Sequence, residues 1–182
     1  EGIAARTKRK FRVATDSNHD RPVAENVLAR DFEPGATDRA WAADITSVAT
    51  GEGWLSLAAV EDLHSRRIVG GSMSERIDSR LVVDALEMAI ARRLLGEGLV
   101  AHSDRGSPYA SARDQRALAG RGLVCSMSRR AIYWDNAPME SFSASLKKEL
   151  VHGEVFATRA EARAALFEYI EVFSNRTRRH SS

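Results

Sequence analysis

The sequence predicts one α/β domain with a mixed five-stranded sheet and helices on both faces. Three segments rich in apolar and β-branched residues come first, separated only by short polar turns, and this pattern is typical of a strand meander. Short apolar segments then alternate with segments whose apolar residues recur every three or four positions, as expected for strands alternating with helices. The length of 182 residues is enough for one complete core.

The predicted strands follow a polar N-terminal segment. Residues 1–39 contain Pro22, Pro34 and Gly35 and lack a sustained hydrophobic period, so we expect a basic arm or linker at 1–39 and a folded core with C-terminal helices at 40–182. Turn-forming residues separate the first three strands. The five strands are expected at residues 41–48, 54–60, 67–74, 99–102 and 123–126.

Capping residues place the helices between and after these strands. Ser79 and Thr158 can each cap a helix N-terminus, Gly120 and Gly122 close a helix that begins at Ser111, and Pro138 suits the first turn of a helix opened by Asn136. The expected helices cover residues 79–96, 111–119, 135–150 and 158–173. The resulting order is β-β-β-α-β-α-β-α-α.

Composition excludes several classes of protein. No segment has the ~18 uncharged apolar residues of a membrane helix, and the single Cys125 excludes an internal disulfide framework and CxxC chemistry. No Gly-x-Ser-x-Gly elbow, Walker A motif or Gly-x-Gly-x-x-Gly loop is present, so a serine hydrolase and a nucleotide cofactor are disfavoured. We expect a cytoplasmic protein without a membrane partner.

Basic residues are concentrated at the two ends of the chain. The net charge is only +2, from 27 Lys+Arg and 25 Asp+Glu, but cations crowd residues 6–12 and 176–179. Such ends suit a polyanion such as DNA, although solvated basic tails would give the same pattern.

Three acidic residues stand where a divalent cation could bind. Asp44 lies inside the first strand, Asp104 follows the fourth strand, and Glu140 lies in the first turn of the helix after Asn136. Carboxylates are the ligands Mg²⁺ prefers, together with water and phosphate oxygens. Each also has a structural alternative: an edge-strand surface residue for Asp44, a turn aspartate for Asp104, and a favourable charge at the helix N-terminus for Glu140.

The spacing of these acids strengthens the catalytic interpretation. Thirty-five residues separate Asp104 from Glu140, and Lys147 follows Glu140 by seven positions. Seven positions are almost two helical turns, so Glu140 and Lys147 share one helix face. A metal-binding carboxylate would then stand beside an ammonium group able to contact the same phosphodiester backbone.

At these residues the chain resembles the aspartate-aspartate-glutamate (DDE) transposases of bacterial insertion sequences, with the integrase catalytic core of the retroviral-integrase superfamily. The similar segments cover nearly the whole chain: residues 41–46, which include Asp44-Ile45-Thr46; 62–70; 102–109 (His-Ser-Asp-Arg-Gly-Ser-Pro-Tyr); 134–142 (Trp-Asp-Asn-Ala-Pro-Met-Glu-Ser-Phe); and 175–181.

The resemblance implies a ribonuclease-H-like fold in which Asp44, Asp104 and Glu140 bind Mg²⁺ or Mn²⁺ as two ions, and Lys147 contacts DNA. It implies strand cleavage that leaves a 3′-hydroxyl and strand transfer by that hydroxyl, as in DNA transposition. The alternatives are a ribonuclease-H-like nuclease without strand transfer and a catalytically inactive DNA-binding remnant. The resemblance also implies a homo-oligomeric synaptic complex and an upstream helix-turn-helix unit, which these 182 residues lack.

Further DNA contacts are expected in the loops around these acids, where an ordinary surface role is the alternative for each cation. Aromatics beside helix starts can stack on DNA ends but are more often core anchors. For His102 a structural or metal-supporting role is favoured, and for Asp62 a turn role. The candidate DNA contacts are Arg105, Arg129, Arg130 and Tyr109, with Tyr133, Trp134 and Phe142 as further aromatic candidates.

Overall fold

The computed structural model describes residues 19–93, 95–130, 132–151 and 155–177. The basic residues at 6–12, together with Arg178 and Arg179, therefore lie outside the described residues. Side chains of Tyr133 and Arg176 are also outside the description. None of the described helices is long and apolar enough to cross a membrane.

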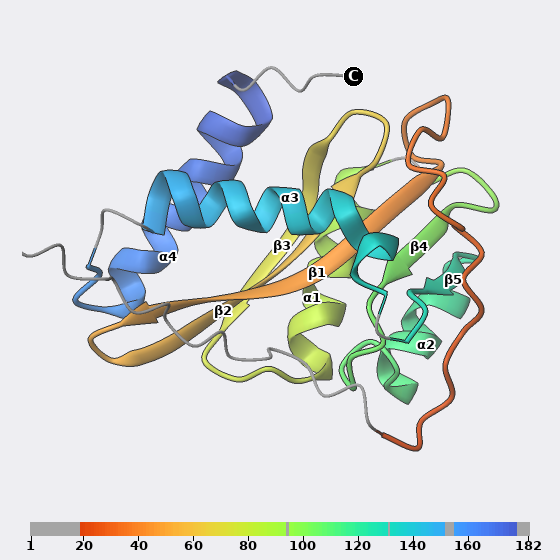
Figure 1. Cartoon of the computed structure of the whole chain (residues 1–182), viewed down its shortest axis with the longest axis horizontal. Coiled ribbons are helices and arrows are strands. Elements are labelled where there is room, and N and C mark those ends of the chain that lie inside the picture. The colour runs from red at the N-terminus through yellow and green to blue at the C-terminus, as the bar shows by residue number, and fades with distance from the viewer. Residues whose placement is uncertain (1–18, 94, 131, 152–154, 178–182) are drawn as a thin grey trace, which may run out of the picture.

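The described elements form a mixed sheet in the order β3-β2-β1-β4-β5, with helices on both faces (Figure 1). Strands β1, β2 and β3 pair antiparallel, and β4 pairs parallel with both β1 and β5, which confirms the predicted fold class. The elements are β1 (Ala40–Thr50), β2 (Gly53–Asp62), β3 (Arg67–Ser74), α1 (Ser79–Arg92), β4 (Val100–Ser103), α2 (Ala112–Ala119), β5 (Val124–Met127), η1 (Tyr133–Asn136), α3 (Ala137–Leu146), η2 (Lys147–Val151), α4 (Arg159–Glu168) and η3 (Tyr169–Thr177).

Several helix ends differ from the sequence-based expectation. Asp78, not Ser79, caps α1 by accepting from Arg80 N and Leu81 N, and α1 ends at Arg92 rather than near residue 96. The predicted helix to residue 150 ends as α-helix at Leu146 and continues as the π-helical turn η2. Tertiary contacts decide such ends, and capping propensity alone cannot choose between adjacent aspartate and serine.

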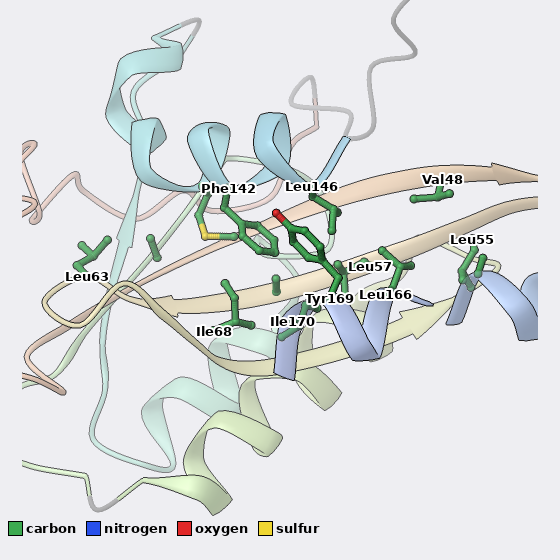
Figure 2. Close-up of a cluster of buried hydrophobic side chains, with 14 of the residues drawn as sticks. Val48, Leu55, Leu57, Leu63, Ile68, Phe142, Leu146, Leu166, Tyr169 and Ile170 are labelled. Atoms are coloured by element: carbon green, nitrogen blue, oxygen red, sulfur yellow. The ribbon is translucent and has the colours of Figure 1, made fainter. Parts of the chain in front are cut away.

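Two hydrophobic clusters, one on each face of the sheet, form the core. Alternate residues of a strand point to opposite faces, so Ala42 belongs to the cluster under α3 and α4, whereas Trp41 belongs to the cluster under α1 and α2. Figure 2 shows Phe142 and Leu146 of α3 facing Tyr169 in the first of these clusters. Helix α3 is therefore fixed across one face of the sheet by apolar packing along its length.

Residues 19–39 contain no helix or strand within their described length. This segment nevertheless lies against the domain, because Leu28 is buried and the Leu28 amide donates to Ser126 Oγ at 3.1 Å. The segment runs beside β5 before it enters β1 (Figure 1).

Candidate active site

Two of the predicted carboxylates come from neighbouring strands. Asp44 lies in the middle of β1, the central strand of the sheet, and pairs with Ala59 of β2. On the other side of β1, Ala43 pairs with Ser103, the last residue of β4, and Asp104 follows Ser103 directly. Parallel pairing of β1 with β4 thus brings Asp44 and Asp104 to the same part of the sheet.

Helix α3 carries the third predicted carboxylate. Glu140 lies in the first turn of α3 and is exposed. Asn136 immediately precedes α3, and its Nδ2 donates to the carbonyl oxygen of Ala43 at 3.1 Å. Asn136 was expected to cap the helix, but among the described residues its side chain makes no capping bond and ties the start of α3 to β1 instead.

The pKa of Asp44 depends on the charges of the other candidate site residues. Burial first, and then the charges of Asp104 and Glu140, raise the pKa of Asp44, while Lys147 lowers it; the resulting pKa is about 8. Negative charge on a half-buried carboxylate beside two other carboxylates is unfavourable unless a cation lies nearby. The charges that act on Asp44 thus come from two further carboxylates and one ammonium group.

The donor set suits a divalent metal in chemistry, although the side chains do not form a closed cage. Among the described residues, no group of three or more His, Cys, Asp or Glu is compact enough to hold a metal ion. Mg²⁺ uses only a few protein carboxylates and fills its remaining positions with water and phosphate oxygens, so an open set of carboxylates is compatible with it.

The loop after β4 holds Asp104 in a turn. Asp104 Oδ1 accepts from the Gly106 amide at 2.8 Å. Asp104 therefore makes a turn contact and is at the same time a candidate site residue. Arg105 is half-buried and its Nε donates to the Ser128 carbonyl at 2.7 Å. Arg130 is exposed.

Tyr109 differs from the DNA contact that the sequence predicted. Its ring is buried in the cluster under α1 and α2, so the structure favours the core alternative, because a buried ring is not accessible for stacking. Burial and the nearby charges of Asp44, Asp104 and Asp114 hold the pKa of Tyr109 well above its usual value. Phe142 is also buried, whereas Trp134 is 73% exposed and is not a core anchor.

His102 and Asp62 have structural roles. His102 is buried and bonds through Nδ1 to Ser126 Oγ at 2.9 Å and through Nε2 to Ser128 Oγ at 3.2 Å. Burial lowers its pKa to about 4, so the ring is neutral at physiological pH. Asp62 accepts from the Ser65 backbone and hydroxyl, which confirms the turn role.

Asp135 is the functional candidate that sequence reasoning missed. Its fully buried carboxylate accepts from Arg129 Nε at 2.9 Å and Nη2 at 2.8 Å, and from Arg30 Nε at 2.8 Å. The guanidinium of Arg129, predicted to contact DNA, is therefore bonded to Asp135. Only the position of Asp135 beside the helix-opening Asn136 hinted at this role, since its partner Arg30 lies 105 residues away.

The Asp135 cluster predicts an acid-sensitive contribution to stability. Hydrogen bonds from Arg129 hold the pKa of Asp135 well below its usual range, so the carboxylate stabilises the fold above the unfolded pKa of ~3.9 and this contribution is lost as pH falls. Replacing Asp135 with Asn should lower the free energy of unfolding at pH 7 by about 1–3 kcal/mol. The difference should shrink below about pH 4 in urea titrations; an equal difference at pH 7 and pH 3 would contradict it.

Comparison with known proteins identifies the family. Residues 35–132 match the family model described as an integrase core domain, and residues 140–182 match a second model of the same description. The chain belongs to the integrase core domain family. Its family match spans β1, β4 and the loop carrying Asp104.

The integrase core domain of this chain is similar to insertion-sequence proteins. It is 46% identical over 181 residues to the transposase InsF for insertion sequence IS3A of Escherichia coli K12, covering 100% of this chain and 63% of the relative. It is 47% identical over 180 residues to the insertion element IS600 uncharacterized 31 kDa protein of Shigella sonnei, covering 98% and 66%. The chain thus spans about two thirds or less of the length of these relatives.

A solved structure supports the fold. The HTLV-2 integrase catalytic core domain in complex with magnesium has a TM-score of 0.57 at 18% identity, covering 77% of this chain and 91% of that one. The five-stranded sheet and its flanking helices are those of the ribonuclease-H-like fold of integrase cores.

Proposed function

We propose that this chain is the catalytic core of a transposase that cuts DNA strands and joins the resulting 3′-hydroxyl to another phosphodiester. The observation that carries the proposal is that the charges of Asp104 and Glu140 both act on the half-buried Asp44, within an integrase core domain. The similarity to a transposase over 100% of this chain supports the same function.

The three carboxylates would hold Mg²⁺ or Mn²⁺, as two ions. Bound divalent ions would supply Lewis acidity at the phosphodiester. The HTLV-2 core with which this chain shares its fold was solved with magnesium, which supports the choice of ion. Carboxylates, rather than a neutral histidine base such as His102, are suited to this task because they bring negative charge to the cations.

The residues of this chain would bind and orient DNA at the same place. Lys147 follows α3 and its charge reaches Asp44, so its ammonium group lies where it can neutralise a phosphate at the site. Arg105 and the exposed Arg130 lie in the flanking loops and extend this basic track. We propose that the working form is a homo-oligomer on insertion-sequence ends and target DNA.

Strand joining is the deciding experiment. The 182-residue chain would be incubated with labelled duplexes carrying candidate element ends in Mg²⁺ or Mn²⁺, with EDTA as the metal-free control. Joined products that need the metal support the transposase. Cleavage without joining would favour the nuclease, and metal-independent binding without cleavage would favour the inactive remnant.

Lys147 and Lys148 form a matched pair for testing DNA binding. We expect Lys147→Ala to weaken binding to DNA of any sequence and to reduce the slope of log affinity against log salt by about 1, since one phosphate contact is lost. Lys148 is exposed on the following position, so Lys148→Ala controls for the loss of one positive charge. Fluorescence anisotropy at several salt concentrations measures both; equal effects would contradict a specific role for Lys147.

A further inference from the structure

Residues 19–32, called here the N-terminal strap, are bonded along the edge of the sheet formed by β5. The Leu28 amide donates to Ser126 Oγ at 3.1 Å, and the Met127 amide donates to the Glu25 carbonyl at 3.3 Å. Leu28 is 5% exposed and belongs to the core cluster under α3. The strap, red to orange in Figure 1, is thus packed on the domain beside β5.

One end of the strap holds the loop that follows Asp104. His19 Nε2 donates to the Arg105 carbonyl oxygen at 2.8 Å. Arg21 Nη1 donates to the Ser107 carbonyl oxygen at 2.7 Å. Both acceptors are backbone atoms within three residues of Asp104, so the strap restrains the path of this loop through its backbone.

The other end of the strap holds the turn that leads into α3. Arg30 Nε donates to Asp135 Oδ1 at 2.8 Å, and Asn26 Nδ2 donates to Asp135 Oδ2 at 3.0 Å. Arg129 contributes its backbone amide at 2.9 Å to the same carboxylate, besides its side chain. Because charge-assisted bonds to a fully buried carboxylate are the strong ones, this cluster is the main polar anchor of η1.

The large aromatic side chain of Trp134 does not help to anchor this turn in the core. Trp134, immediately before Asp135, is 73% exposed, and Arg129 and Arg130 are exposed as well. The next residue after Asp135, Asn136, bonds to Ala43 beside Asp44. The dipeptide 135–136 therefore connects three separate segments: the strap, the loop after β5, and β1.

We propose that Asp135 and Arg30 are positioning residues, through which the N-terminal strap sets the place of Glu140 relative to Asp44 and Asp104. The inference rests on the proposed function, because it takes these three carboxylates as the catalytic group. Glu140 stands five residues after Asp135, in the first turn of α3, so a shift of the turn moves its carboxylate. Neither Asp135 nor Arg30 needs to touch DNA or metal for this effect.

A kinetic experiment separates positioning from DNA binding. In Arg30→Met the hydrogen bond to Asp135 is lost while the aliphatic stem remains. We expect kcat for strand cleavage to fall about tenfold, which corresponds to 1.4 kcal/mol, about the net contribution of one charge-assisted hydrogen bond. KM for DNA and the salt dependence of KM should stay within about twofold of the parent's values. Arg30→Lys, which keeps one donor, should restore most of kcat. Arg39→Met removes an exposed cation of the same N-terminal segment and should leave kcat unchanged.

Two kinetic results would overturn the proposal. An unchanged kcat in Arg30→Met means that the Asp135 bond positions nothing. A raised KM with a smaller salt slope means that Arg30 binds DNA directly.

Amide hydrogen exchange tests the same idea without any activity. Exchange of the amides of residues 133–140 should be about tenfold faster in Arg30→Met than in the parent. The turn opens more easily once a hydrogen bond equivalent to a factor of about ten is missing. Arg39→Met should match the parent. Equal exchange in Arg30→Met and the parent overturns the positioning role whether or not the chain cleaves DNA.

A parallel Glu140→Gln protein keeps the two proposals distinguishable. Full cleavage by Glu140→Gln would contradict the proposed function, whereas the hydrogen-exchange result would still decide the role of the strap. Loss of cleavage in Glu140→Gln together with parent-like kinetics and exchange in Arg30→Met would retain the function and overturn the positioning role.

Discussion

Replacing Asp104 with Asn should reduce metal-dependent DNA cleavage by about 10³-fold or more, since a metal-holding carboxylate supplies several kcal/mol of transition-state stabilisation. The change removes one negative charge and hardly alters shape. Asp104 Oδ1 accepts from the Gly106 amide at 2.8 Å, and an asparagine amide oxygen supports the same kind of turn. The loss should therefore lie in the chemistry and not in the fold. Initial rates with a labelled duplex measure it.

Asp78→Asn is the matched control for this variant. Asp78 is an exposed carboxylate whose oxygen caps α1, accepting from Arg80 N at 2.9 Å and Leu81 N at 3.0 Å. Asparagine is an equally good N-cap, so the same chemical change should leave cleavage at the parent rate. Retention of more than about a tenth of the parent rate by Asp104→Asn would be incompatible with the several kcal/mol expected of a metal ligand.

Replacing Gly70 with Ala should destabilise the domain by about 3 kcal/mol or more, because overpacking against a rigid element costs 1–3 kcal/mol and sometimes more. Gly70 lies in β3 under α1. An added methyl carbon would overlap the Ala85 carbonyl oxygen and lie 2.8 Å from Ala89 Cβ. Both neighbours belong to the buried side of α1, so the helix would have to move away from the sheet.

The adjacent Gly71 provides the control for this prediction. A methyl carbon at Gly71 would approach the Ala58 carbonyl oxygen no closer than 3.8 Å, which is ordinary contact. Gly71→Ala should therefore change stability by less than about 0.5 kcal/mol, while Gly70→Ala lowers the Tm by roughly 10 °C. Thermal unfolding followed by circular dichroism compares the two; similar Tm values would show that α1 accommodates the methyl group.

Local patterns in the sequence predicted most of the fold. The alternation of Trp41 and Ala42 between the two clusters, and the three-and-four spacing on α1, are set by residues close in the chain. Helix ends were less predictable: both Asp78 and Ser79 are good caps, and the structure has Asp78 in that role. The π-helical turn after Leu146 has no local signal that the sequence analysis used.

The candidate site likewise has features that the sequence predicted and features that only the structure shows. The acids Asp44, Asp104 and Glu140 could be proposed from residue type, position and resemblance, whereas the parallel pairing of β1 with β4 came only from the structure. For Tyr109 the sequence left both a DNA contact and a core position open, because an aromatic residue in a polar loop can face either the core or solvent. The burial of the Tyr109 ring is decided by α2 and the strands that cover it.

The sequence by itself determined the order of the elements, the two faces of the sheet and the three acids, because these depend on spacing along one segment. Only the tertiary structure decided that Arg129 bonds to Asp135, that Arg30 joins it from 105 residues away, and that Asn136 ties α3 to β1. These bonds link charged and polar groups from distant segments. No local period encodes such pairs, since a buried carboxylate takes whichever donors the packed chain brings within hydrogen-bonding distance.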